Sequence, residues 1–246
     1  MSGSGYDYST SIYSNDGRVF QIEYAQKAAD LSGTALGIRA KDGVVLACES
    51  FPGSSLIIPH TQQRILPVTY NIGMVSSGLL ADGRYLTKQA QEAAQSYKKN
   101  YHENIPLSQL ADHLQLQMQQ YTFYGSLRPI GVATIIAGFD EKPQIFSLDP
   151  SATCYGYKGI AVGREKTQAR TAIEALPLDE ITCRQAVKEA AKIIHSLRHE
   201  EEKAFEIEMG WVTEENKRVF EKVPLEIVQQ AEDEAKAYLQ EQEEQD

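Results

Sequence analysis

Residues 33–48 read GTALGIRAKDGVVLAC, two short apolar runs on either side of an Asp-Gly pair. The runs are Thr34–Arg39 and Val44–Cys48, and Asp42-Gly43 between them favours a tight turn. This stretch therefore predicts a β-hairpin. Further strand-like runs follow at 71–76, 132–138, 144–148, 159–162 and 205–211, the last with strict apolar–polar alternation.

Helical periodicity alternates with these strands. Apolar residues recur at helical spacing in 18–30, 79–101, 107–121, 164–175, 182–197 and from Pro224 onward. Thr182 and Gln185 have the spacing of a capping box at the start of the fifth of these helices. Hairpin connections and segregated helices predict the α+β class. Helical pairs that occur twice suggest a four-layer αββα sandwich, with two sheets packed between helical layers.

The length of 246 residues fits one domain, with no internal repeat or low-complexity linker. We expect an N-terminal segment with its helix (1–33), a core (34–223) and a C-terminal helix with an acidic tail (224–246). Three scattered cysteines are typical of a reducing compartment rather than of a secreted disulfide framework. No signal peptide or membrane-spanning run is recognisable, so we expect no membrane partner.

The net charge of −10 is concentrated at the C-terminal end. Residues 200–246 contain 16 acidic and 5 basic side chains, and the rest of the chain is nearly neutral. Binding to nucleic acid requires a field of positive charge, which neither part supplies. The sequence therefore predicts no nucleic-acid partner.

Several motifs resemble those of proteasome alpha subunits. The most specific are Gly5-Tyr6-Asp7 and the run YSNDGRVFQIEYA at 13–25. Others lie at 33–37, 77–82, 121–131, 149–151 and 161–163, so the resemblance covers nearly the whole chain. Residues 39–45, 182–184, 203–211 and the acidic tail are most similar to one eukaryotic subtype, which occupies the seventh ring position.

The resemblance implies the Ntn-hydrolase version of the αββα fold. It also implies a place in a seven-membered outer ring of proteasome alpha subunits, stacked on a ring of catalytic beta-ring subunits. The expected partners are these subunits and the C-terminal tails of the regulatory particle or other activators. The expected location is the cytoplasm and nucleus, and no cofactor is implied.

An alternative is an active hydrolase that is cleaved before Thr34, because Gly33-Thr34 resembles the junction cut in catalytic beta precursors. Aligning the hairpin turn with beta subunits puts Gly33 at the nucleophile position, Glu49 at the carboxylate position and Arg64 near the lysine position. A threonine nucleophile needs its own free amine and a nearby lysine, and arginine replaces that lysine poorly. We therefore expect no catalytic residue. A third possibility is an interaction protein that has the same fold but does not assemble into a ring.

The resemblance assigns a gate to the N-terminal segment, which would close the axial pore of the ring. The positions of Tyr6, Asp7, Asn15 and Tyr24 form the cluster that holds the gate open in the family. Tyr8 stands where the family often has arginine, and Asn15 where it usually has proline. Asparagine can make the same turn less rigidly. The alternative to a gate is a frayed terminus without a role.

Arg64 stands where family members usually carry a lysine in a pocket between subunits that receives activator tails. A guanidinium can bind a terminal carboxylate through two hydrogen bonds. The alternative is an ordinary surface arginine. His195 and His199 are four residues apart on a predicted helix but lack the glutamate of a zinc-binding motif, so we expect no metal site.

Overall fold

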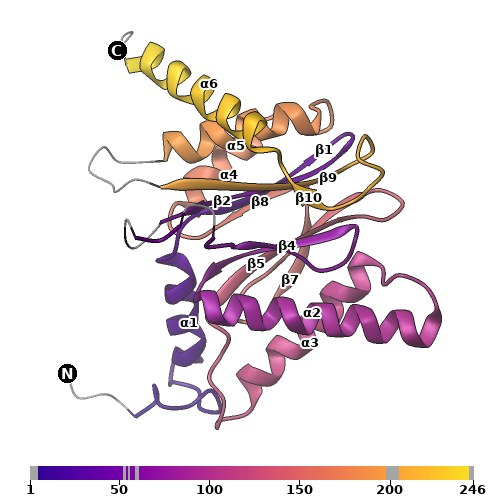
Figure 1. Ribbon diagram of the computed structural model, residues 1–246. Helices are drawn as coiled ribbons and strands as arrows, with labels where there is room; N and C mark the ends of the chain where they lie inside the picture. Colours follow the sequence, from indigo (N-terminus) through magenta and orange to yellow (C-terminus); the bar gives the residue numbers. More distant parts are fainter. Residues whose placement is uncertain (1–4, 52–53, 55, 59–60, 198–204, 244–246) are drawn as a thin grey trace.

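Two five-stranded antiparallel sheets lie face to face in the computed structural model, which describes residues 5–51, 54, 56–58, 61–197 and 205–243 (Figure 1). The first sheet has the order β10-β9-β2-β1-β8. Its strands are β1 (Ala35–Ala40), β2 (Gly43–Ser50), β8 (Gly159–Val162), β9 (Glu206–Thr213) and β10 (Glu221–Lys222). The second sheet has the order β3-β4-β5-β6-β7. Its strands are β3 (Ile65–Pro67), β4 (Ile72–Gly78), β5 (Val132–Phe139), β6 (Pro143–Leu148) and β7 (Cys154–Tyr157).

A helical layer covers the outer face of each sheet (Figure 1). The helices over the first sheet are α4 (Lys166–Glu174), α5 (Cys183–Ser196) and α6 (Leu225–Glu243). Those over the second are α2 (Leu80–Tyr101) and α3 (Leu107–Phe123). One apolar cluster fills each helix–sheet contact, and a third lies between the sheets. The predicted four-layer αββα sandwich is confirmed.

The predicted hairpin over 34–48 is the centre of the first sheet. Ala40 of β1 pairs with Gly43 of β2 across the turn, and every residue of β2 is buried. A Cβ atom on Gly43 would lie 2.1 Å from the Val212 carbonyl oxygen, so no larger residue fits there. The Asp42 carboxylate accepts a hydrogen bond of 2.7 Å from the Cys183 N–H at the start of α5. The turn therefore joins the sheet to its helical layer.

The structure differs from the sequence-based expectations at short elements and at helix ends. Strands β3, β7 and β10 were not predicted, because none of these short segments forms an apolar run or alternation that stands out in the sequence. Leu79 and Tyr101, the first and last residues of the predicted second helix, are 47% and 64% exposed, and α2 itself begins at Leu80. The Thr182–Gln185 capping box is confirmed.

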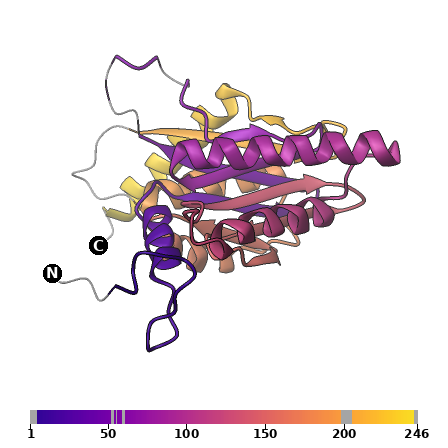
Figure 2. The same ribbon diagram turned by 90° about the horizontal axis from the view of Figure 1, so that it is seen from below.

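Helix α1 (Phe20–Asp30) stands at one end of the sandwich and packs on β4 and β5 (Figure 1). Its buried residues are Ala25 and Ala29, whose small side chains let the helix approach the sheet closely. The N-terminal segment continues from the start of α1 away from the sheets (Figure 2). Among the described residues, no helix is long and apolar enough to cross a membrane.

Candidate functional site

The Gly33–Thr34 junction, where the chain passes from α1 to β1, is buried. Thr34 is 1% exposed, and its backbone N–H donates a hydrogen bond to Glu49 Oε1. Glu49 is itself only 6% exposed. The Ser77 hydroxyl donates to the Gly33 carbonyl oxygen at 2.7 Å. The nitrogen of Thr34 is thus a peptide nitrogen, and its single N–H is used by a buried carboxylate.

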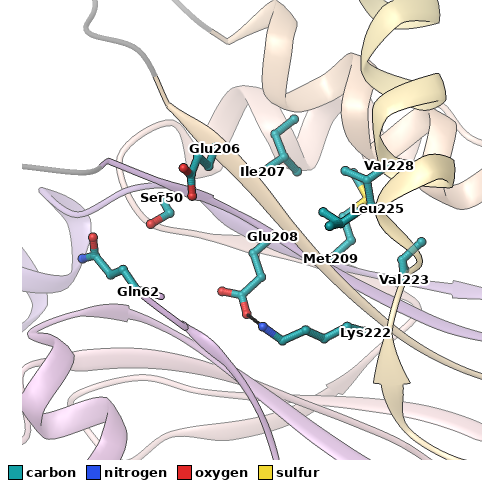
Figure 3. Close-up of a pocket in the computed structure, with 10 residues that line it drawn as sticks. All are labelled: Ser50, Gln62, Glu206, Ile207, Glu208, Met209, Lys222, Val223, Leu225 and Val228. Carbon is teal, nitrogen blue, oxygen red and sulfur yellow. Dashed lines mark ion pairs between the residues drawn. The ribbon is translucent and has the colours of Figure 1, made fainter. Parts of the chain in front are cut away.

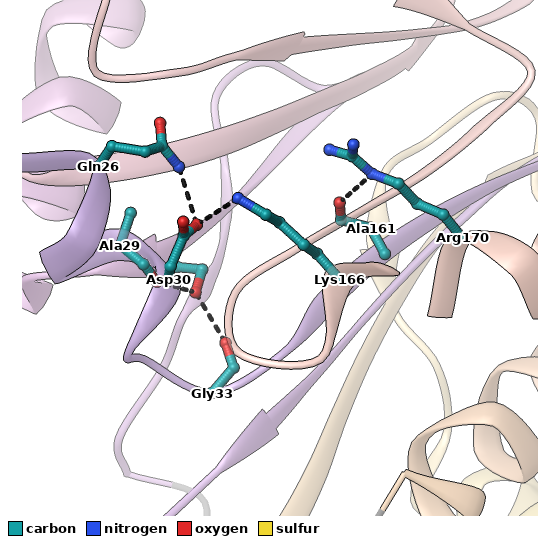
Figure 4. A network of polar contacts seen from close by, with 8 residues as sticks. Gln26, Ala29, Asp30, Gly33, Ala161, Lys166 and Arg170 are labelled. Carbon is teal, nitrogen blue, oxygen red and sulfur yellow. Dashed lines mark hydrogen bonds and ion pairs between the residues drawn. The ribbon is translucent and has the colours of Figure 1, made fainter. Parts of the chain in front are cut away.

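The end of α1 is tied to the rest of the molecule beside this junction (Figure 4). Asp30 Oδ1 accepts a hydrogen bond from Gln26 Nε2 at 2.8 Å and pairs with Lys166 Nζ of α4 at 2.7 Å. Ser77 of β4 also donates to the Ala29 carbonyl oxygen at 3.3 Å. Three elements therefore hold the chain that precedes Thr34 in place.

Position 33 has no room for a side chain. A Cβ atom on Gly33 would lie 2.9 Å from the Glu49 carbonyl oxygen and 3.3 Å from the Phe51 ring. Arg64 Nη1 donates to the Ser32 hydroxyl at 2.8 Å. The structure thus brings together the three positions that the hairpin alignment matched to a catalytic centre, and they hold a glycine, a buried glutamate and an arginine.

A carboxylate fixes the backbone of Arg64. Glu208 Oε2 accepts hydrogen bonds from the N–H of Arg64 at 2.8 Å and of Ile65 at 3.3 Å. Its other oxygen, Oε1, pairs with Lys222 Nζ at 3.2 Å beside a pocket of about 140 Å³ (Figure 3). The side chain of Arg64 is half-buried, and its Nε has no acceptor among the described residues.

The N-terminal segment makes few contacts by comparison. The Tyr6 hydroxyl donates to Asn15 Oδ1 at 3.4 Å, and Gln21 Nε2 of α1 donates to the Asp7 carbonyl oxygen. Tyr8 is 77% exposed. Tyr6, Asp7 and Asn15 therefore lie on the side where α1 begins, while Tyr8 points into solvent.

Tyr24 lies one turn further along α1 and is half exposed. Its ring stacks on Phe20 with 6.2 Å between the centroids. Together with Gln21 it lines a groove of about 180 Å³ against Arg128 and Pro129. Gln21 is thus the residue that connects the segment around Asp7 to Tyr24. Gln21 was not among the gate residues expected from the sequence.

Sequence reasoning also missed the loop 124–131. Its members Leu127, Arg128 and Pro129 belong to one of the motifs that indicate the family, but no role followed from the motif alone. In the structure the loop contacts Thr10 and forms one wall of the groove at Tyr24. Only the fold could reveal this, because more than a hundred residues separate the partners in the sequence.

The described residues do not form a metal or thiol centre. Within residues 5–51, 54, 56–58, 61–197 and 205–243, no group of three histidine, cysteine or acidic side chains is placed to hold a metal ion. His195 packs its ring edge-on to Phe205 at 5.2 Å, and His199 lies outside the described residues. Burial raises the pKa of Cys48 and Cys183 well above the usual value and that of Cys154 to about 11. These thiols therefore stay protonated and unreactive at neutral pH.

Two family models match the chain. The model described as "Proteasome subunit" matches residues 29–212, and a second model, for the N-terminal signature of A-type proteasome subunits, matches residues 6–28. The boundary between the two matches falls near the end of α1, beside the Gly33–Thr34 junction.

Curated relatives match over almost the full length. The chain is 45% identical to the alpha type-3 proteasome subunit of Acanthamoeba castellanii over 243 residues, 98% of this chain and 96% of the relative. It is 44% identical to the alpha type-3 proteasome subunit of Spinacia oleracea, with 97% of each chain covered. It is also 44% identical to the probable alpha type-7 proteasome subunit of Saccharomyces cerevisiae, over 85% of this chain and 74% of the relative. The predicted similarity to the type-3 subtype is confirmed.

Proposed function

The chain belongs to the proteasome subunit family, in the branch with the alpha N-terminal signature, and we propose that it is a non-catalytic alpha-ring subunit of the 20S core particle. In this role it occupies the seventh position of a seven-membered ring that stacks on a beta ring. It helps to close the entry pore and offers a docking surface to activators. Such a particle would serve ubiquitin-dependent protein degradation in the cytoplasm and nucleus.

The closed Gly33–Thr34 junction is the observation that supports a non-catalytic role. An N-terminal threonine nucleophile uses its own α-amine as the base. Here the Thr34 nitrogen is acylated by Gly33, and its N–H donates to Glu49. Arg64 stands where a lysine with a tunable amine would be required, and arginine replaces that lysine poorly. The junction therefore keeps the peptide bond before Thr34 buried, and Thr34 has no free α-amine to act as the base.

Intact mass measurement on the assembled particle tests this assignment. We expect the chain to retain residues 1–33 and to form no adduct with an inhibitor that reacts with N-terminal threonine, while beta subunits in the same sample do. A chain that begins at Thr34 and carries the adduct would establish the alternative hydrolase. A chain that stays monomeric in native mass measurement would contradict the ring role.

The gating role concerns the segment around Tyr6, Asp7, Tyr8, Asn15 and Tyr24. Its support is that Tyr8 is exposed, that Tyr6 and Asp7 are half-buried, and that few hydrogen bonds attach the segment to the start of α1. Deletion of residues 1–12 is expected to raise basal hydrolysis of small peptides by the whole particle. Unchanged hydrolysis would mean that other subunits alone seal the pore.

The docking role concerns Arg64. The guanidinium is half-buried, and its Nη1 is oriented by the hydrogen bond to the Ser32 hydroxyl. It is therefore placed to bind the carboxylate of an activator tail. Arg64→Ala is expected to weaken stimulation of the particle by C-terminal tail peptides, and Arg64→Lys to retain most of it. Equal stimulation of all three proteins would contradict a role for Arg64.

A further inference from the structure

A forked ion pair fixes the loop 124–131 to the second sheet's helical layer. Arg128 Nη1 and Nη2 donate to the two carboxylate oxygens of Asp82 at 2.6 and 2.8 Å. Asp82 Oδ2 also accepts the Gly131 N–H at 2.8 Å. The Asp82 side chain is 13% exposed and lies in the first turn of α2, where the helix dipole favours a negative charge. One carboxylate thus holds both the middle and the end of the loop.

The same loop is the contact surface for the N-terminal segment. The Tyr124 carbonyl oxygen accepts two hydrogen bonds, from the Leu127 N–H of the loop turn at 3.0 Å and from the Thr10 hydroxyl at 3.2 Å. Gly125 lies directly beneath the segment, because a Cβ atom there would be 2.8 Å from Ser9 Oγ and 3.0 Å from Ser11 Oγ. The loop turn and the segment therefore share one acceptor.

Thr10 is the anchor of the segment at this point. It is 7% exposed, whereas Tyr8 is 77% and Tyr13 is 71% exposed. A buried hydroxyl group that loses its acceptor destabilises the folded state. Thr10 therefore moves together with the Tyr124 carbonyl oxygen when the loop moves.

The loop has little apolar packing of its own to keep it in place. Tyr124 is 56% and Leu127 40% exposed, and the buried apolar residues Pro129 and Ile130 lie near its end. A segment with few buried contacts opens at low free-energy cost. The bidentate Arg128–Asp82 pair, a charge-assisted contact of good geometry, is therefore the main polar constraint on the loop's position.

We propose that the loop 124–131, locked by the Arg128–Asp82 pair, is the seat of the N-terminal segment of the same chain and sets how firmly that segment closes the pore. Arg128 and Asp82 are positioning residues that act through Tyr124 and Thr10. The proposal rests on the gating role given above and adds the device that regulates it. It also explains why the loop has a glycine at position 125, where a side chain would collide with Ser9 and Ser11 of the N-terminal segment.

Hydrogen exchange of the backbone amides in residues 8–12 tests the seat, measured in assembled particles purified through a tag on this chain. The variants are Arg128→Gln, Asp82→Asn, the double variant and Arg128→Lys. Arg184→Gln is the matched control, because it removes an exposed arginine–glutamate pair (Nη2 to Oε1 3.1 Å) that does not touch the loop. Basal peptide hydrolysis is measured on the same particles.

We expect Arg128→Gln and Asp82→Asn each to speed exchange in 8–12 roughly threefold to tenfold, the range for loss of about one net hydrogen bond. The double variant should be no faster than the faster of the two single variants, because both remove the Arg128–Asp82 pair. Arg128→Lys should restore part of the protection, and peptide hydrolysis should rise in the order of the exchange rates. Thr10→Val should mimic the loop variants.

Two results overturn the proposal. One is exchange in 8–12 that matches the wild type in every Arg128 and Asp82 variant; the other is additive effects of the single variants. If hydrolysis rises on deletion of residues 1–12 but not in the loop variants, the seat is wrong and the gating role stands. If neither hydrolysis nor exchange responds to any change, both are wrong.

Discussion

The Gly33–Thr34 junction and the N-terminal segment lie at opposite ends of the same helix, α1, and are held very differently. At the junction, Thr34 and Glu49 are buried, and contacts from β2, β4 and α4 converge on three residues. In the segment, Tyr8 and Tyr13 face solvent, and single hydrogen bonds join it to α1 and to one loop.

The difference distinguishes a rigidly held part of the protein from a part whose contacts can change. Buried polar groups are almost always hydrogen-bonded. The buried polar groups at the junction therefore need one another as partners. An exposed segment exchanges its contacts with water at little cost. The junction is therefore closely held by its contacts, and the N-terminal segment is the part that would have to move in the proposed gating role.

The largest expected effect is at Glu49. Glu49→Ala leaves the buried Thr34 N–H without an acceptor and opens a cavity, so we expect the free energy of unfolding to fall by about 2–4 kcal/mol. Glu49→Gln keeps an acceptor and should cost about 1 kcal/mol or less. Denaturant unfolding of the purified chain measures both. Equal losses in the two variants would mean that the hydrogen bond does not account for the stability of the junction.

A smaller effect is expected at Ser77, whose hydroxyl donates to the Gly33 carbonyl oxygen. Ser77→Ala should lower the free energy of unfolding by about 1–2 kcal/mol, since it leaves a buried carbonyl oxygen unpaired. Ser9→Ala in the exposed segment is the matched control and should leave stability unchanged. A Ser9→Ala loss as large as that of Ser77→Ala would erase the contrast between the regions.

Lower pH should act on the loop that seats the segment. The hydrogen bonds from Arg128, and to a lesser degree from the Gly131 N–H, hold the pKa of Asp82 below its usual range. A lowered pKa in the folded state means stabilisation that is present at neutral pH and is lost as the pH falls through the range where Asp82 takes up a proton. The difference in Tm between wild type and Asp82→Asn should be constant above about pH 5 and shrink below about pH 4. A difference that grows on acidification would contradict the ion pair.

The smallest effect is expected at Arg18, which pairs with Glu23 on the surface at the start of α1. The hydrogen bond between them raises the pKa of Arg18 and lowers that of Glu23, but both side chains are solvated. Arg18→Gln should not measurably change Tm, at low or high salt. A shift of several degrees would show that the entry to α1 is held as firmly as its end.

The long elements could be predicted from the sequence because their patterns are local. The hairpin at 34–48, the capping box at Thr182 and the apolar stripes of α3 and α5 each depend on residues a few positions apart. The motifs at 5–25 were long enough to indicate the family. The short strands β3, β7 and β10 could not be predicted, because they form only by pairing with β4, β6 and β9.

The candidate site divides in the same way. Alignment on the hairpin turn placed Glu49 and Arg64 near Gly33, and the hydrogen bonds of Thr34 and Ser32 agree with that placement. Ser77, Gln21 and the Arg128–Asp82 pair could not be found, because their partners are distant along the chain. Nothing local marks a serine or glutamine as the donor to a particular carbonyl oxygen.

The order of residues by itself determined the element types, the fold class and the lack of any lysine between Lys41 and Lys88, since these depend on composition and on short-range spacing. The tertiary structure alone decided that Thr34 has a buried acceptor, that position 33 excludes a side chain and that the N-terminal segment rests on the loop 124–131. Those facts depend on close packing between distant parts of the chain, where a few tenths of an ångström decide which atoms fit.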